Sequence, residues 1–229
     1  MTNLRFVRKI LPPGKLSQII LGGQDGLVNT FGVILGIAAA SSDIRIVIAG
    51  GLAASIAEAV SMGAVAYTSQ RASHDHYLSL LASEKKAITE RPKEEKAEVK
   101  KIYQEKGFSG EELSHIVQLI TSNKKAWLSI MMSDELKVSP IENRQVYINS
   151  VIVFLSAFLG ALIPLFPFFF FSLKGGIYIS FFISSISLFG VGFYQAKSTV
   201  GKPIRNGLEL LVIGMSAAVI GYGIGYLFR

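Results

Sequence analysis

The sequence predicts an all-α membrane protein with five transmembrane helices and a helical cytoplasmic insert between the second and the third. Half of the 229 residues are hydrophobic and only 17% are charged, whereas soluble domains carry about 25% charged residues. The apolar residues form five long blocks, and most charges lie between them. Blocks of about 20 apolar residues match the hydrocarbon thickness of a bilayer, where a helix keeps its backbone hydrogen bonds within the segment.

The blocks divide the chain into three predicted parts. Residues 1–68 hold an N-terminal tail and two spans, 69–145 form a polar insert, and 146–229 hold spans three to five. The blocks themselves lie at 16–41, 44–68, 146–170, 177–194 and 208–228. Short turns at Ser42-Asp43 and at Lys174-Gly175-Gly176 predict two helical hairpins.

Lysine and arginine determine the predicted orientation. With a cytoplasmic N-terminus, 20 of the 23 basic residues lie on the cytoplasmic side, and only Arg45, Lys174 and Arg229 lie outside. Because cytoplasmic loops are enriched in basic residues, we expect the N-terminus and the 69–145 insert to be cytoplasmic. The same enrichment explains the net charge of +7 without a nucleic-acid partner. No cleaved signal peptide is expected, since the polar start lacks a short apolar segment and cleavage site.

Three helices are predicted within the insert from Pro92 onward. Pro92 suits the first turn of one helix, which Gly107 ends. The run Ser109-Gly110-Glu111-Glu112 is interpreted as a capping box that opens the next helix. A third helix is expected from about Lys124 to Leu136, ahead of Pro140.

Asp25 and Glu58 each interrupt an apolar block. An ionisable group in hydrocarbon is costly, so it usually faces a cavity and marks an ion or proton path. Asp25 lies in a glycine-rich stretch that is expected to weaken the helix; a helix cap at the interface is the alternative. Glu58 lies one turn before Met62 on one helix face, and a glutamate bonded between helices is its alternative. Together the two carboxylates favour a transport path, and the adjacent thioether suits transition metals.

The insert contains a further set of residues of metal-ligand type. Glu95 and Glu98 project from one helix face, and Glu84 precedes them in a separate helical segment. Met131, Met132 and Glu135 cluster on the last helix of the insert. Convergence of these groups would create a divalent-metal site; a solvated surface with salt bridges to lysines is the alternative. His74-Asp75-His76 is a second, weaker metal candidate or a polar helix end.

No enzyme class is supported by the motifs. The chain has no cysteine, which excludes thiolate metal sites, and it has no nucleophile elbow, P-loop or dinucleotide motif. Glu112 and His115 form one Glu-x-x-His element, whereas ferritin-like di-iron sites need two. The spacings Gly32-x-x-x-Gly36 and Gly221-x-x-x-Gly225 allow close helix contact, either in a dimer or within one subunit.

Four stretches of the sequence resemble the vacuolar iron transporter family, and they follow one another in the family's order. They are Asp25–Val33, Ala57–Ala64 followed by Tyr67, Glu95–Val99, and Trp127–Leu136. The resemblance implies a five-span homodimer in the membrane, with the insert as a cytoplasmic metal-binding domain. It also implies proton-coupled export of Fe²⁺, with Mn²⁺ as another substrate, from the cytosol. The membrane would be the cell membrane in a prokaryote and the vacuolar membrane in a eukaryote.

The resemblance further implies site residues. Asp25 and Met62 would line the translocation path, to which Glu58 adds a carboxylate. The metal ligands of the insert would be Glu84, Glu95, Glu98, Met131, Met132 and Glu135. Two positions depart from the plant pattern, because Ala54 and Ala87 stand where that pattern has glutamates. The metal is substrate, so no obligatory cofactor is expected. The alternative function is a membrane metal sensor or storage protein that does not transport.

Overall fold

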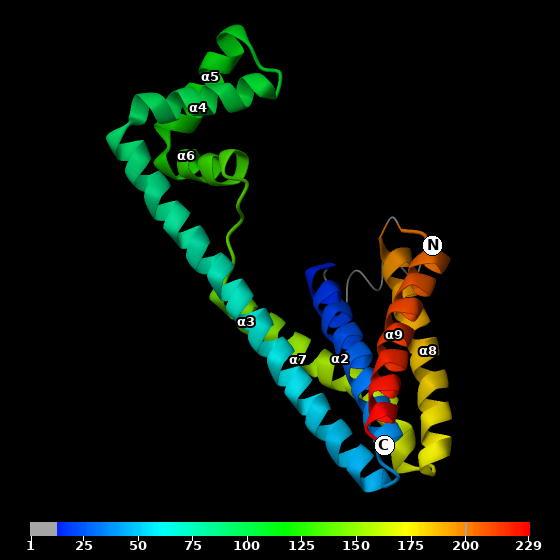
Figure 1. The fold of residues 1–229 in the computed structure, drawn as a ribbon. Coiled ribbons are helices and arrows are strands. Elements are labelled where there is room, and N and C mark those ends of the chain that lie inside the picture. Colours follow the sequence, from blue (N-terminus) through cyan, green and yellow to red (C-terminus); the bar gives the residue numbers. More distant parts are fainter. Residues whose placement is uncertain (1–12, 200) are drawn as a thin grey trace. The chain divides into compact units, whose positions relative to one another are not determined.

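The computed structural model describes residues 13–199 and 201–229, which fold into helices and short connections (Figure 1). The elements are α2 (Pro13–Ala40), α3 (Ile44–Glu90), α4 (Pro92–Glu105), α5 (Gly110–Ser122), α6 (Lys124–Ile130), η1 (Met131–Glu135), α7 (Asn143–Leu165), η2 (Phe166–Phe169), α8 (Leu173–Ser198) and α9 (Pro203–Leu227). No strand occurs within these described ranges. The basic tail residues Arg5, Arg8 and Lys9 lie outside them.

Five helical segments are long and apolar enough to cross a membrane. They are Gly14–Ala40, Ile44–Glu90, Asn143–Phe169, Leu173–Ser198 and Pro203–Leu227. These segments cover the five predicted apolar blocks to within one residue at their ends. The prediction of an all-α chain with five candidate spans is therefore confirmed.

The second predicted turn is misplaced, because the short connection lies at residues 170–172, between η2 and α8. Lys174, Gly175 and Gly176 lie in the first turn of α8, where the Gly176 N–H donates to the Ser172 carbonyl at 2.7 Å. Gly176 is needed for packing instead of turning, because a Cβ there would come within 2.7 Å of the Phe168 ring.

Helix α3 continues well beyond the second apolar block. Its 47 residues correspond to about 70 Å at the α-helical rise, more than twice the hydrocarbon thickness of about 30 Å. The helix does not end near Thr68 because no glycine or proline occurs between Gly63 and Pro92. Only the apolar part up to about Thr68 is therefore needed for the membrane crossing.

The described chain forms two compact units. The first, which we call the membrane unit, includes the described residues up to Tyr67 and from Tyr147 onward. The second, the insert unit, is Thr68–Val146. Within the membrane unit, α2 packs along α9, and α8 also packs against α9. The two predicted glycine pairs meet each other at the first of these contacts, so they act within one chain.

The glycines of α9 allow a test of this contact. A Cβ on Gly225 would collide with the Gly36 carbonyl, whereas a Cβ on Gly223 would meet no atom within 4 Å. We expect Gly225→Ala to destabilise the protein by about 1–3 kcal/mol, the usual cost of overpacking. Gly223→Ala should leave the stability unchanged or slightly higher, because alanine favours helix. Thermal unfolding in detergent measures both, and equal melting temperatures for the two variants would contradict this account of the α2–α9 contact.

The glycines beside Asp25 do not weaken α2, which is continuous from Pro13 to Ala40. They provide close approach to α7 instead. A Cβ on Gly22 would lie 2.5 Å from the Ser156 hydroxyl oxygen, and one on Gly26 would collide with the Ala157 carbonyl. The expectation of a weakened helix at this point is therefore wrong, and the glycines fix the position of α2 against α7.

The insert unit has its own apolar core. Its buried members are Ile88, Val99, Leu113, Val117, Trp127 and Met131. These residues come from the end of α3 and from α4, α5, α6 and η1, so one core joins all the helices of the unit. The predicted capping box is wrong, because the side chain of Ser109 makes no cap hydrogen bond to α5. Asn123 is the effective cap, accepting from the backbone N–H groups of Lys125 and Ala126 at the start of α6.

Candidate metal sites

Three carboxylates from three different elements converge in the insert unit. Glu84 comes from α3, Glu95 from α4 and Glu135 from η1, and a carboxylate oxygen of each lies within 4.8 Å of the others. Glu84 and Glu95 are buried, with 8% and 5% exposure. Glu98 is in contact with the same group, since its side chain interacts with those of Glu95 and Glu135. The structure thus brings together the four glutamates singled out from the sequence.

The apolar core holds these carboxylates in place through helical spacing. Residues four apart lie on one face of a helix. Each converging carboxylate is four residues from a core side chain: Glu84 from Ile88, Glu95 from Val99, and Glu135 from Met131. Packing of the core therefore fixes the three backbones from which the carboxylates project.

Glu135 lies at the end of a π-helical turn. The Leu136 N–H donates to the Met131 carbonyl at 3.0 Å, which is an i to i+5 bond, and turns of this kind occur often at functional sites. The neighbouring Asp134 forms an ion pair with Lys106, at the end of α4. This pair connects the π turn to the helix that carries Glu95.

The electrostatics of the cluster favour binding of a cation or protons. Loss of hydration, followed by the negative charge and hydrogen bonding of Glu98, raises the pKa of Glu135 to about 7. Burial is also the main cause that raises the pKa of Glu95. In Glu84, Oε1 is buried and has no hydrogen-bond partner within the described residues. Because a buried, unpartnered carboxylate oxygen is costly, this group is suited to a cation or a proton.

The two methionines predicted as ligands have different surroundings. Met131 is fully buried in the apolar core, whereas Met132 is 3% exposed and is not among the residues of that core cluster. Met131 therefore supports the position of Glu135, and Met132 is the better placed of the two to offer a thioether.

A second polar group lies in the membrane unit, at the contact of α2 with α3. The Asn29 Nδ2 amide donates to Glu58 Oε1 at 3.0 Å. The carboxyl group of Asp25 is in side-chain contact with both Glu58 and Asn29. Asp25, Glu58 and Met62 are each partly buried, and Met62 follows Glu58 by one turn of α3. The two intramembrane carboxylates predicted from separate helices are therefore neighbours.

Asn29 was not predicted as a site residue. Its signal in the sequence is its spacing, since a polar amide follows Asp25 by four residues inside an apolar block. This spacing puts the two side chains on one face of α2. The partner of Asn29 could not be found in the same way, because Glu58 lies in another helix.

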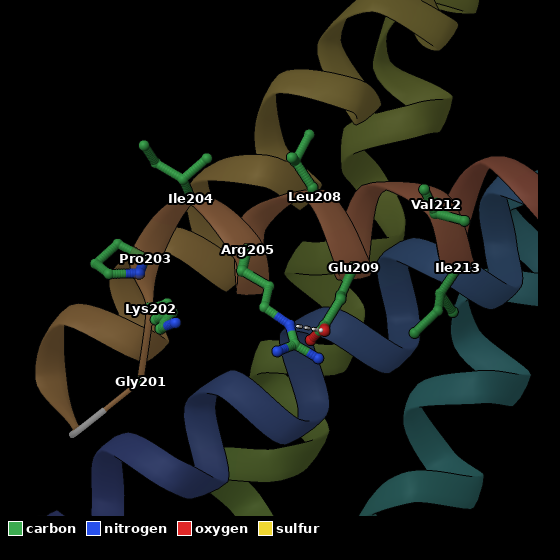
Figure 2. A pocket seen from close by; sticks show the side chains of 9 residues that line it. All are labelled: Gly201, Lys202, Pro203, Ile204, Arg205, Leu208, Glu209, Val212 and Ile213. Atoms are coloured by element: carbon green, nitrogen blue, oxygen red, sulfur yellow. Dashed lines mark hydrogen bonds and ion pairs between the residues drawn. The ribbon is translucent and has the colours of Figure 1, made fainter.

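A third carboxylate within a predicted span, Glu209, is neutralised on its own helix. It pairs with Arg205 at 2.8 Å, and both line a shallow pocket along the start of α9 (Figure 2). The remaining lining residues, Gly201 to Ile204 with Leu208, Val212 and Ile213, come from the same helix and the residues just before it. Ligand sites usually gather polar groups from several elements, so this pocket is not a candidate metal site.

The His74-Asp75-His76 group does not form a metal site in the structure. The buried His74 ring lies with Nδ1 2.6 Å from the Ile141 carbonyl, to which it donates, and Asp75 pairs with Arg71 at 3.1 Å. The His74 contact has a structural role, joining α3 to the segment that precedes α7, whereas the Asp75–Arg71 pair lies within α3.

The chain is similar in sequence to known proteins over most of its length. The VIT family model matches residues 16–226. A vacuolar iron transporter of Centaurea cyanus is 32% identical over 207 residues, covering 90% of this chain and 84% of the relative. Vacuolar iron transporter 1 of Arabidopsis thaliana is 30% identical over 206 residues, with 90% and 82% covered. A vacuolar iron transporter of Plasmodium falciparum is 30% identical over 229 residues, with 96% and 84% covered.

Proposed function

The chain belongs to the VIT family, and from this premise we propose that it is a proton-coupled transporter that exports Fe²⁺ from the cytosol. The relatives named above are iron transporters. The observation that carries the proposal is the contact between the carboxyl groups of Asp25 on α2 and Glu58 on α3. The side-chain amide of Asn29 donates a hydrogen bond to Glu58. Other divalent transition metals, Mn²⁺ among them, fit the same oxygen and sulfur ligands.

The insert unit is proposed to collect the metal. Its ligands would be Glu84, Glu95, Glu98 and Glu135, with the thioether of Met132 beside them. Clustered carboxylates repel one another until a cation or protons neutralise them, which supports a divalent ion as the natural occupant. The balance of basic residues along the chain supports a cytoplasmic position for this unit and for the N-terminus.

The membrane unit is proposed to carry the ion across. Asp25 and Glu58 offer two carboxylates at the α2–α3 contact, and the thioether of Met62 follows one turn later on α3. Polar side chains at membrane depth avoid lipid and face a cavity or a protein partner. Asn29 is exposed on the single chain, which supports a second copy covering this face in a homodimer.

Proton coupling follows from competition for the same carboxylates. Metal ligands must be deprotonated to bind, so metal binding releases protons and proton binding releases metal. A membrane site that alternates between the two sides would then exchange one for the other. This chemistry needs no further cofactor, and no catalytic step is assigned to the chain.

Metal binding by the insert unit should strengthen as the pH rises from about 6 to about 8, because Glu135 must lose its proton to bind the cation. The pKa of about 7 for Glu135 sets this range.

The free energy of unfolding of the metal-free unit should fall as the pH rises. A carboxyl whose pKa is higher in the folded than in the unfolded protein stabilises most at low pH, and this stability is lost as the pH rises toward about 7.

Titrations with Mn²⁺, followed by the fluorescence of Trp127, measure this pH dependence. Trp127 is the only tryptophan of the chain and lies in the apolar core of the insert unit. Thermal unfolding with and without Mn²⁺ measures the second effect. An affinity that is constant across this pH range would contradict the assignment of Glu135 as a ligand.

The transport function itself is tested with the full chain reconstituted in liposomes that enclose a Fe²⁺-sensitive dye. We expect saturable anaerobic Fe²⁺ entry above the level of protein-free liposomes. The sensor or storage alternative predicts metal binding at the insert, seen by Trp127, with no entry above that level. This second result would overturn the transport proposal.

A further inference from the structure

Asn29 bridges the two carboxylates of the membrane unit. Its Nδ2 amide donates to Glu58 Oε1 at 3.0 Å, and it is also in side-chain contact with Asp25, four residues earlier on α2. An asparagine amide has two N–H donors and one carbonyl acceptor. One side chain can therefore donate to a carboxylate on each of two helices.

We propose that Asn29 is a positioning residue that holds Asp25 and Glu58 together as one pair of oxygen ligands for the divalent cation. This inference rests on the transport function proposed above and adds a residue that determines its affinity. Two neighbouring carboxylates repel each other, so a site for a cation needs a donor that keeps both in place when the ion is absent. Hydrogen bonds to charged acceptors are the stronger class of such bonds.

The geometry leaves ligand atoms available. Donation to Oε1 of Glu58 leaves its other carboxylate oxygen for the cation. The side-chain carbonyl of Asn29 adds an oxygen acceptor on the same amide group. Hence the amide preorganises the site, and the ion need not displace it.

Packing within the chain separates this role from a structural one. Asn29 is an exposed residue, whereas its neighbours Thr30 and Phe31 are 1% and 0% exposed and provide the packing of α2. Asn29→Leu removes both donors at nearly constant size and adds an apolar residue to an apolar helix. This change is therefore compatible with folding and membrane insertion.

The test compares anaerobic Fe²⁺ flux kinetics in proteoliposomes for the native chain, Asn29→Leu and Asn29→Gln. For Asn29→Leu we expect KM for Fe²⁺ to rise about tenfold, the effect of losing a hydrogen bond to a charged group, with the maximal rate within about twofold. Asn29→Gln retains the donors on a longer side chain and should restore most of the loss. In a Glu58→Ala background, Asn29→Leu should raise KM by clearly less than it does in the native chain, since one of its two carboxylate partners is absent. Gln24→Leu, an amide on the same helix outside this network, is the matched control and should leave KM unchanged.

Three outcomes would overturn the inference. An unchanged KM in Asn29→Leu shows that the bridge does not determine affinity, although native flux would still support transport. A lower maximal rate with unchanged KM, equal in the leucine and glutamine variants, indicates a structural role. Absence of flux in the native chain overturns the transport function and, with it, the role given to Asn29.

Discussion

Replacing Asp25 with asparagine is expected to reduce anaerobic Fe²⁺ flux by at least about 100-fold. The change keeps the size of the side chain and its place against Glu58 and Asn29, but it removes one of the two negative charges at the α2–α3 contact. A divalent cation that crosses a low-dielectric region needs these charges. The measurement is the initial rate of Fe²⁺ entry into liposomes containing equal amounts of native and variant protein.

The matched control for this prediction is Glu209→Gln. Glu209 is also a carboxylate in an apolar helix, but its partner is Arg205 on the same helix. We expect its flux to stay within about twofold of native, as for substitutions away from the site. Asp25→Asn protein that is folded and transports at the native rate would remove Asp25 from the path.

The second large effect is expected in the insert unit, where Glu95→Gln should weaken Mn²⁺ binding by about 100-fold. Even partners in the outer shell of metal sites commonly contribute 10–100-fold to affinity, and Glu95 is buried in direct reach of Glu84 and Glu135. The same change removes a repelling charge, so the metal-free unit should melt at an equal or higher temperature. Fluorescence of Trp127 reports the binding, and thermal unfolding without metal reports the stability.

Glu94→Gln is the control for this effect. Glu94 is adjacent to Glu95 in the sequence but is exposed and pairs with Arg91 at 3.5 Å. Exposed pairs of this kind contribute little, so both affinity and stability should be close to native. Equal losses of affinity in the two variants would indicate that Mn²⁺ is attracted nonspecifically to an acidic surface and would contradict a defined site.

The membrane helices could be predicted from the sequence because their signal is local. Composition and block length locate each span, and the structure departs from them mainly at helix ends. The predicted turn at Lys174 to Gly176 is wrong because glycine occurs both in turns and at close contacts between helices. Here Gly176 leaves room for the ring of Phe168, and this contact between α8 and η2 has no signature in the local sequence.

The two candidate sites likewise combine residues that the local sequence identifies with contacts that it does not. Spacing in the sequence puts Glu95 beside Glu98, and proline at position 92 separates their helix from that of Glu84. The convergence of Glu84, Glu95 and Glu135 depends on packing of the core around Val99 and Met131, which spacing alone does not specify. The π turn that carries Glu135 could not be predicted either, because the run Met131–Glu135 is compatible with a continued α-helix.

Asn29 and Ser109 show the limits of reading single residues. Asn29 is polar in an apolar block, but its function depends on Glu58 in another helix. Ser109 has the sequence of a cap for α5, yet its side chain makes no cap hydrogen bond, whereas Asn123 caps the next helix, α6. A local motif is compatible with more than one structure, and tertiary contacts determine which of them forms.

The most direct test of proton-coupled transport is to record Fe²⁺ and proton movement together in one preparation. Liposomes containing the native chain and a pH-sensitive dye are given an acidic interior, and Fe²⁺ is added outside under anaerobic conditions. We predict that Fe²⁺ enters as the interior becomes more alkaline, and that collapsing the pH gradient slows entry. Fe²⁺ entry at the same rate with and without the gradient, and with no proton movement, would contradict the coupling.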